Sequence, residues 1–563
     1  MAVLVTGCSG MDGEQPVDAD PPPTEGGTVS LLLDDASGWD LDPLGRHTRE
    51  TQAFLSAFLH RTLLTYTPAQ NPAEQLMLTP DLATDTGSVD PTGTEWSFTL
   101  RDDAVWEDGA AVTCADVKYG VSRRFAEDVF SSSPRHAIDL LDVPVEADGR
   151  TSRYKGPYSG RGEDFFDSAV TCEGSTITFR LREPSADFDE VVTLLAFSPV
   201  RKDRDTGDSY GDKPLSSGPY RLLEDSGGLQ SVLVRNENWD PASNPTRPAF
   251  PDRVVVQAGL ERDEIDNRLL ADSGMDRFAL ATDISEVNLA RVFDDSALQE
   301  RRWNQPDLEV EYLAINTELV PEVGHRRAIA AAFDRQGCLD VVGGRFHGGD
   351  IDGVLSPALA LDFAETGMWT GLLGAPIRPD GDPDLAAELI EETGVGMPDL
   401  RLDYPDTSTN AAAVEAFMAS MEAAGIQTLP NPIDPATYYS EILDDEDAGH
   451  LTWVSWSPDW PNASTVLAPL YAGDGGFNLS RVNQVGGAQD GELTSLIAAA
   501  SAENDRLEQG QLWRLVNTRA SELALLVPAS ATRGQRAWGS GLGGVRYFAP
   551  YASYDYGWIY VKP

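Results

Sequence analysis

A chain of 563 residues with 41% apolar composition is too long for one hydrophobic core, so we expect two or more lobes. Asp and Glu number 91 against 42 Lys and Arg, and the resulting net charge of −49 argues against a nucleic-acid partner. No run approaches the ~20 apolar residues that a membrane-spanning helix needs.

The chain begins with a short apolar segment that ends in Val5-Thr6-Gly7-Cys8. This ending resembles a bacterial lipobox, in which the cysteine is lipidated and becomes the new N-terminus, so Cys8 would carry a membrane anchor. Residues 1–8 would be a lipoprotein signal remnant whose remaining part lies upstream or was trimmed. A coincidental small-small-Cys sequence is the alternative. Residues 9–28 are rich in Gly, Pro and Asp and predict a flexible tether.

Strand-like and helix-like patterns mix along the rest of the chain. Residues 29–33 predict a strand and residues 48–64 a helix, and a strand pattern at 96–100 precedes a helical pattern at 114–121. Further strands are expected at 176–181, 220–223, 232–234 and 254–256, and further helices at 325–336 and 383–393. Because neither strict βαβ alternation nor an internal repeat is visible, the pattern indicates mixed α/β lobes.

Three cysteines follow Cys8. None belongs to a CxxC motif or to a Cys/His cluster with metal-ligand spacing, so no metal site is predicted. Cys114 and Cys172 flank elements of one subregion, and in an exported protein they are the favoured disulfide pair. Cys338 is then expected to be a buried free thiol.

Two sequence patterns imitate catalytic or metal-binding motifs. Residues 207–211 fit the G-x-S-x-G nucleophile pattern around Ser209, but their flanks are charged and turn-forming, without the strand and helix that a hydrolase needs. Residues 380–384 imitate an EF-hand loop, but Leu385 stands at the glycine position, so Asp382 is better interpreted as a helix N-cap. With no phosphate-binding loop either, we expect a protein that is not an enzyme and has no cofactor.

An aromatic cluster surrounds a single carboxylate late in the chain. Trp453, Trp456 and Trp460 fall within eight residues, and Asp459 lies among them. Core packing would explain any one of these tryptophans, but three interrupted by proline and aspartate favour a loop that lines a cleft. Indole rings would supply apolar walls, and a desolvated Asp459 would pair with a cation.

Several short motifs recur in the order found in a known family. They are PDLA at 80–83, WSFTLR at 96–101, VWEDG at 105–109, VTCADVKYG at 112–120, SGPY at 217–220, YLAINT at 312–317 and RRAIAAAFDR at 326–335. Together they resemble the family 5 extracellular solute-binding proteins, which include oligopeptide-, dipeptide- and nickel-binding members. The resemblance extends over nearly the whole chain after the tether.

The resemblance implies an α/β, two-lobed periplasmic-binding-protein type II fold that closes like a hinged clamp. Lobe I would comprise residues 29–281, with an extra subdomain at about 66–180, and lobe II residues 282–527. Residues 528–563 would return to lobe I, and two crossing strands would join the lobes.

The resemblance also implies a binding site. In peptide-binding members a Trp-x-x-Asp motif places an aspartate against the ligand's α-ammonium, and Trp456-Ser457-Pro458-Asp459 matches it. From the aromatic cluster itself, Trp453 and Trp460 are expected to provide further contacts. The family's second acid is replaced by Asn462, which leaves the ligand class open. Arg345, in a Gly-rich stretch, is the candidate for binding a peptide carboxylate.

These features predict a monomeric, peptide-binding component of an ABC importer. Lipid on Cys8 would anchor it to the outer face of the cytoplasmic membrane, where it would deliver peptides to the permease. Three alternatives stay open: the same fold binding a nickel chelate, opine, sugar or antibiotic; a secreted hydrolase using Ser209; and a sensor or signalling receptor.

Overall fold

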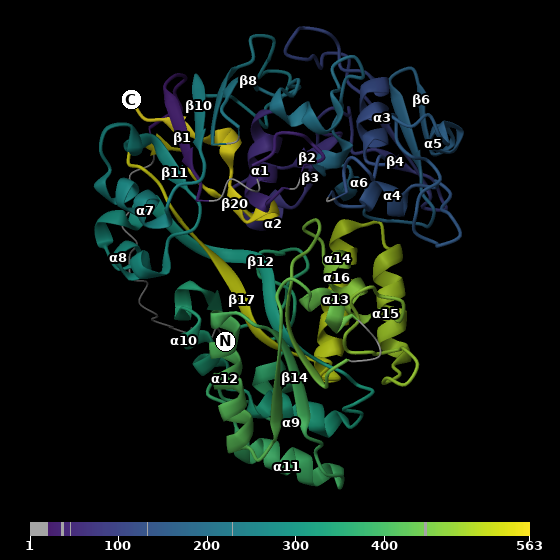
Figure 1. Ribbon diagram of the computed structural model, residues 1–563, viewed down its shortest axis with the longest axis vertical. Coiled ribbons are helices and arrows are strands. Elements are labelled where there is room, and N and C mark those ends of the chain that lie inside the picture. The colour runs from purple at the N-terminus through teal and green to yellow at the C-terminus, as the bar shows by residue number, and fades with distance from the viewer. Residues whose placement is uncertain (1–20, 35–38, 46, 132, 228, 444–447) are drawn as a thin grey trace, which may run out of the picture.

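The computed structural model describes residues 21–34, 39–45, 47–131, 133–227, 229–443 and 448–563. The expected lipobox with Cys8 and most of the expected tether lie outside these residues. Two large mixed sheets occupy the upper and lower parts of the molecule, and a smaller antiparallel sheet lies beside the upper one (Figure 1). Among the described helices, none has the length and apolar character required to cross a membrane.

The sheet of lobe I is built around the strand β1 (Thr28–Leu32), which is parallel to both of its neighbours. Its strand order is β11 (Ala279–Ala281), β1, β10 (Arg253–Gln257), β9 (Gln230–Arg235) and β8 (Tyr220–Asp225). Successive side chains of β1 point to opposite faces. Leu31 therefore packs with helix α1 (Arg49–Phe58), and Leu32 packs with helix α7 (Arg262–Ala271).

The segment after β11 belongs to the same lobe. It contains the helix α8 (Leu289–Phe293), and its apolar side chains Leu289, Val292 and Leu298 share a core with Leu32. The core that contains Leu32 therefore includes side chains between the expected boundary after residue 281 and the start of β12 (Arg302–Ile315).

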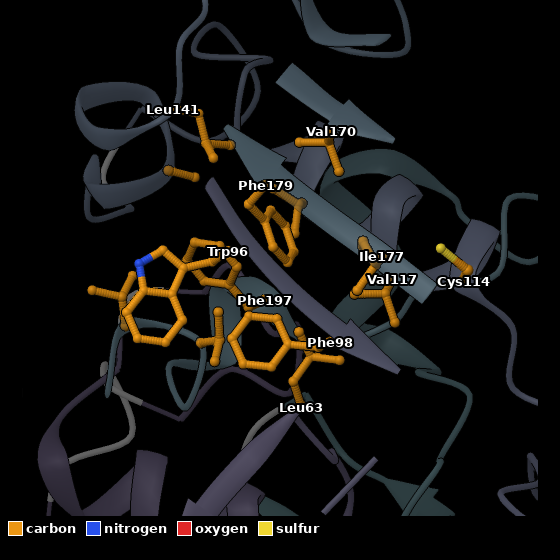
Figure 2. Close-up of a cluster of buried hydrophobic side chains, with 14 of the residues drawn as sticks. Leu63, Trp96, Phe98, Cys114, Val117, Leu141, Val170, Ile177, Phe179 and Phe197 are labelled. Atoms are coloured by element: carbon orange, nitrogen blue, oxygen red, sulfur yellow. The ribbon is translucent and has the colours of Figure 1, made fainter. Parts of the chain in front are cut away.

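The extra subdomain is a four-stranded antiparallel sheet with short helices on one face. The strand order is β4 (Ser88–Val89), β5 (Glu95–Thr99), β7 (Thr176–Arg180) and β6 (Val170–Glu173). The helices are α3 (Cys114–Arg123), α4 (His136–Leu140), α5 (Glu163–Ala169) and α6 (Phe188–Val191). Trp96 and Phe98 point into the core between sheet and helices (Figure 2), and that core extends from Leu63 to Leu215, beyond the expected range of 66–180.

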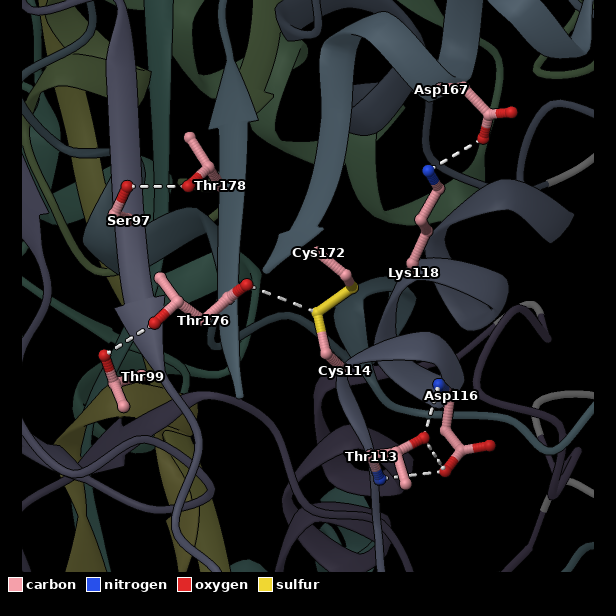
Figure 3. The surroundings of a disulfide bond; sticks show 10 residues. All are labelled: Ser97, Thr99, Thr113, Cys114, Asp116, Lys118, Asp167, Cys172, Thr176 and Thr178. Atoms are coloured by element: carbon pink, nitrogen blue, oxygen red, sulfur yellow. Dashed lines mark hydrogen bonds and ion pairs between the residues drawn. A yellow bond between two sulfur atoms is a disulfide. The ribbon is translucent and has the colours of Figure 1, made fainter. Parts of the chain in front are cut away.

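A disulfide between Cys114 and Cys172 ties helix α3 to strand β6 (Figure 3). Thr113 and Asp116 form a reciprocal capping box at the start of α3, which fixes the helix end that carries Cys114. The third cysteine, Cys338, is a buried free thiol in the core of lobe II.

Lobe II contains a six-stranded mixed sheet covered by helices on both faces. Its strand order is β13 (Gly348–Gly349), β17 (Leu526–Ala537), β12, β16 (Leu451–Trp456), β14 (Leu400–Pro405) and β15 (Thr428–Ile433). One face packs against α9 (Val323–Ala332), α10 (Arg335–Val341), α11 (Pro383–Thr393) and α12 (Ser408–Ala423). The other packs against α13 (Tyr438–Ile442), α14 (Ser464–Tyr471), α15 (Gly491–Ala502) and α16 (Arg506–Glu522).

The antiparallel strands β12 and β17 run from one lobe into the other (Figure 1). Their pairing is interrupted between Pro306 and Val310, where the register shifts. After β17 the chain returns to lobe I, where Trp538, Tyr554 and Ile559 pack beside α1. The remaining short elements are α2 (Pro72–Gln75) and the pairs β2 (Leu64–Tyr66) with β3 (Leu78–Pro80), β18 (Leu542–Gly543) with β21 (Tyr560–Val561), and β19 (Tyr547–Phe548) with β20 (Ser553–Tyr554).

Replacing Cys114 and Cys172 together by alanine should lower the free energy of unfolding of the subdomain by roughly 2–4 kcal/mol. The reason is that the bridge closes a loop between residues 58 positions apart and so restricts the unfolded chain. Urea unfolding with and without reductant measures the effect. The Cys338→Ala variant should respond to reductant as the wild type does, and equal midpoints for the double variant and the oxidised wild type would contradict the prediction.

Candidate functional site

A cavity of about 440 Å³ lies where the two lobes, the subdomain and the crossing strands meet. This volume is within the range of roughly 300–1,000 Å³ typical of small-molecule sites. Lobe I contributes residues before and within α1, and lobe II contributes the loop that follows β16. The lining residues are Pro43, Leu44, Gly45, His47, Arg49, Gln52, Tyr66, Pro134, His136, Thr193, Leu194, Leu195, Ala196, Leu308, Ser457, Pro458, Asp459, Trp460, Pro461, Pro550 and Tyr551.

The lobe II wall is a loop between a central strand and a helix. Strand β16 pairs with β12 and β14 and ends at Trp456, and Pro458, which has no backbone N–H, cannot continue the ladder. The backbone N–H of Asp459 donates to Thr465 Oγ1 at 3.2 Å, which fixes the loop to the first turn of α14. Asp459 is thus held at the edge of lobe II that faces lobe I.

The three tryptophans of the sequence cluster have different environments. Trp453 is only 5% exposed, packs in the lobe II core with Phe333 and Phe417, and does not line the cavity. Trp456 also lies away from the cavity, because its ring packs on Phe477 and its Nε1 donates to a backbone carbonyl of α14. Trp460 lines the cavity.

Trp460 also joins lobe II to the subdomain. Its indole Nε1 donates to Asp187 Oδ2 at 3.0 Å, and Ser464 Oγ donates to the same oxygen at 2.5 Å. The Trp460 ring meets the His136 imidazole edge to face, with centroids 5.5 Å apart, and packs against the subdomain core. A single ring therefore serves as cavity wall and as interlobe contact.

Asp459 lines the cavity. The surrounding protein excludes water from part of its hydration shell and raises its pKa, and the nearby His136 imidazole opposes that rise. The residue as a whole remains exposed, which is consistent with a group at the wall of an accessible cavity. On the opposite wall, burial lowers the pKa of His47, against the influence of the Asp40 carboxylate.

Arg49 is the cationic lining residue that sequence reasoning missed. It is the first residue of α1, and Thr48 caps this helix by accepting a hydrogen bond from the Thr51 backbone N–H. Its guanidinium reaches Asp307 Oδ1 at 2.7 Å and donates to Ser457 Oγ in lobe II. No local motif marked Arg49, because its role depends on contacts with residues hundreds of positions away.

Two other sequence candidates lie outside the cavity. Arg345 is in a short turn after α10, its side chain is 76% exposed, and it pairs with Asp294 at 3.1 Å, so the structure does not support it as the carboxylate-binding residue. Asn462 is buried within lobe II, where it donates to Gln509 Oε1 and accepts from the Ser464 backbone N–H. Its exchange for the family's acid therefore removes no charge from the cavity wall.

Ser209 occupies a turn rather than a nucleophile elbow. It is exposed within the 3₁₀ turn η2 (Gly207–Asp212), and its Oγ lies 3.3 Å from Asp208 Oδ1. The described residues directly before this turn, 198–206, do not form the strand that a serine nucleophile elbow requires.

A second interlobe contact lies beside the cavity. Arg506 of α16 reaches Glu190 of the subdomain at 3.0 Å and Asp362 of lobe II at 2.6 Å. Both carboxylates are almost completely buried, and burial raises the pKa of Glu190 far above its usual range although Arg506 opposes the rise. Arg506 therefore pairs with two buried carboxyl groups that come from different lobes.

Two α/β lobes joined by crossing strands, with a cavity at their junction, define the class of clamp-like ligand-binding proteins. The sequence model described as "Bacterial extracellular solute-binding proteins, family 5 Middle" matches residues 77–478. The chain therefore belongs to the family 5 extracellular solute-binding proteins.

Individual relatives agree with this assignment. The chain is 24% identical to the periplasmic murein peptide-binding protein MppA of Escherichia coli, over 73% of this chain and 72% of that protein. It is 25% identical to the probable D,D-dipeptide-binding periplasmic protein DdpA of the same organism, but the alignment spans 44% of this chain and less than half, 42%, of that protein. The solved structure of clavulanic acid biosynthesis oligopeptide binding protein 2 is similar over 97% of both chains, with a TM-score of 0.82 and 28% identity.

Replacing Arg506 by methionine should lower the free energy of unfolding by about 3–5 kcal/mol, because Glu190 and Asp362 lose the cation that compensates them in a buried site. Thermal and urea unfolding measure the loss. Arg519, on the same helix α16, is more exposed and pairs with Asp490 at 2.7 Å and with the exposed Glu492 and Glu522, so Arg519→Met leaves no fully buried charge and should cost clearly less, about 1 kcal/mol. Equal losses in the two variants would contradict the role assigned to Arg506.

Proposed function

We propose that this protein captures short peptides in the interlobe cavity and delivers them to the permease of an ABC importer. The names of the relatives support a peptide ligand, since they refer to murein peptides, D,D-dipeptides and oligopeptides. We further propose that the protein acts as a monomer, without catalysis, and is held at the outer face of the cytoplasmic membrane by lipid on Cys8.

The position of Asp459 is the observation that carries the proposal. Its carboxylate lines a cavity whose other walls are largely proline, leucine and aromatic side chains. In such a partly dehydrated setting a carboxylate attracts a cation strongly, and a peptide's α-ammonium can both pair with it and donate hydrogen bonds to it. Trp460, fixed by its hydrogen bond to Asp187, gives the same end of the site a rigid apolar wall.

A ligand that contacts the lobe I wall and the lobe II wall of the cavity favours closure of the lobes. The two arrangements of a hinged protein differ by a few kcal/mol, so a ligand that contacts lobe I and lobe II together shifts the population toward the closed one. In this proposal lobe I with its subdomain comprises residues 29–301 and the return after β17, and lobe II comprises most of the chain between the crossing strands.

Replacing Asp459 by alanine should weaken peptide binding by about 3 kcal/mol, roughly a hundredfold in Kd, because the bound ammonium loses its counter-charge. Titration calorimetry with a peptide identified by native mass spectrometry of the purified protein measures this loss. N-acetylation of the same peptide should have a comparable effect on the wild type. The exposed Asp380→Asn, outside the cavity, is the matched control and should leave Kd unchanged.

A change of less than twofold for Asp459→Ala would remove Asp459 from the site. Tight binding of N-acetylated peptides, or co-purification of a chelate, opine, sugar or antibiotic, would show that the fold serves another solute.

Affinity for the peptide should fall on acidification at a higher pH than an ordinary aspartate would cause. Burial raises the pKa of Asp459 above its usual value of about 3.9, and the protonated form cannot pair with an ammonium group. Affinity should therefore be constant near neutral pH and decrease as the pH falls through this raised pKa. Kd measured against pH tests this, and Asp459→Asn should remove the dependence. An unchanged pH profile in that variant would assign the titration to another group.

A further inference from the structure

The guanidinium of Arg49 occupies a position between three parts of the molecule. It extends from the start of α1 into the cavity wall, and it contacts Asp307 of β12 at 2.7 Å and Ser457 of the lobe II loop. Ser457 is two residues from Asp459, so the loop that carries the cavity's carboxylate also contacts its arginine. The Arg49 guanidinium and the Asp459 carboxylate therefore line the same cavity, on two walls that are in contact through Ser457.

Asp307 comes from the crossing segment rather than from either lobe's core. It lies between Pro306 and Val310, where the pairing of β12 with β17 changes register, and the next residue, Leu308, lines the cavity. Both members of the Arg49–Asp307 pair retain partial exposure, 28% and 24% of their side-chain surfaces. An ion pair in such a setting contributes little net stability, so exchange of one carboxylate for another costs little.

Arg49 itself is anchored independently of Asp307. The adjacent Glu50 pairs with Arg536 of β17 at 3.0 Å and accepts a hydrogen bond from Ser553 at 2.7 Å. These buried contacts hold the first turn of α1 against the second crossing strand. The guanidinium would thus stay at the cavity if Asp307 moved away.

We propose that Arg49 binds the carboxylate of the peptide, and that Asp307 holds the place of that carboxylate in the arrangement seen here. The inference rests on the proposed peptide-binding function and identifies the second charged contact of the same site. A guanidinium has five N–H donors in a planar fork that matches a carboxylate, so a peptide C-terminus can replace Asp307 on it while its N-terminus pairs with Asp459. Release of Asp307 frees the crossing segment, which links ligand capture to movement of the hinge.

The ratio of binding between free-acid and amidated peptides tests the proposal. The probes are two mixtures of di-, tri- and tetrapeptides with identical sequences, one with free C-termini and one amidated, and native mass spectrometry gives the bound fraction of each. The wild type should prefer the free acids by about tenfold, the size of one charge-assisted hydrogen-bonded contact. Arg49→Gln should reduce this ratio to within about twofold of one. Asp307→Asn should raise it about threefold or more, because the competing internal carboxylate is gone.

Arg345→Gln is the matched control, because this exposed arginine lies outside the cavity; it should keep the wild-type ratio. Arg49→Lys keeps the positive charge and should retain part of the preference for free-acid peptides. This result would distinguish recognition of the carboxylate by charge from a general loss of folding. Circular dichroism confirms folding of each variant.

Three outcomes would overturn the proposal. The first is an unchanged ratio in Arg49→Gln, and the second is an equal loss of binding of both mixtures in that variant. The third is a ratio near one in both the wild type and Asp307→Asn. If the wild type binds neither mixture, the proposed peptide-binding function fails together with this inference. If binding depends on Asp459 but not on Arg49, only this inference is overturned.

Discussion

The antiparallel pairing of β12 with β17 is the constraint on which the binding site depends. Strand β12 leads from lobe I into lobe II and β17 leads back, and the two are neighbours in the lobe II sheet, so the position of the lobes relative to each other is set by a short stretch of paired backbone. Where the pairing is irregular, between Pro306 and Val310, the chain has fewer ladder bonds to resist bending. The cavity lies beside this stretch, since Leu308 is one of its walls.

Charged side chains form further contacts between the lobes, apart from the crossing strands. Arg49 joins α1 to the crossing strand and to the lobe II loop, and Arg506 joins α16 to the subdomain. These contacts differ in burial. The carboxylates around Arg506 are almost inaccessible, so breaking that contact exposes uncompensated charges, whereas the pair of Arg49 with Asp307 is partly solvated and exchangeable. The Arg506 contact suits a structural role, and the Arg49–Asp307 pair suits a site at which a bound group replaces a side chain.

The family, the fold and the Asp459 loop were predictable because their signals are local or ordered along the chain. Motif order identified the family, and the tryptophan cluster interrupted by Pro458 and Asp459 indicated a cleft-lining loop, which is where the structure places Asp459. The cluster does not distinguish Trp453, which lies in the lobe II core because a central strand covered by helices on both faces buries both of its side-chain rows. The boundary after residue 281 was expected because a short strand ends there, and the core packing that continues to Leu298 depends on contacts that no local pattern shows.

The lobe I wall could not be predicted, and the reason is geometric. Arg49 and Asp459 are separated by most of the chain and come together because β12 and β17 hold lobe II against lobe I. A local window shows Arg49 as one cation at the start of an ordinary helix, and it shows Arg345 as an equally plausible cation in a Gly-rich turn. What distinguishes them is the partner that each finds in the folded protein: Arg345 meets a solvated surface aspartate, and Arg49 meets the crossing segment at the edge of a cavity. The function of a cation in this fold is thus decided by its position relative to the crossing strands, and the Arg49 position is the one from which a bound anion could act on the hinge.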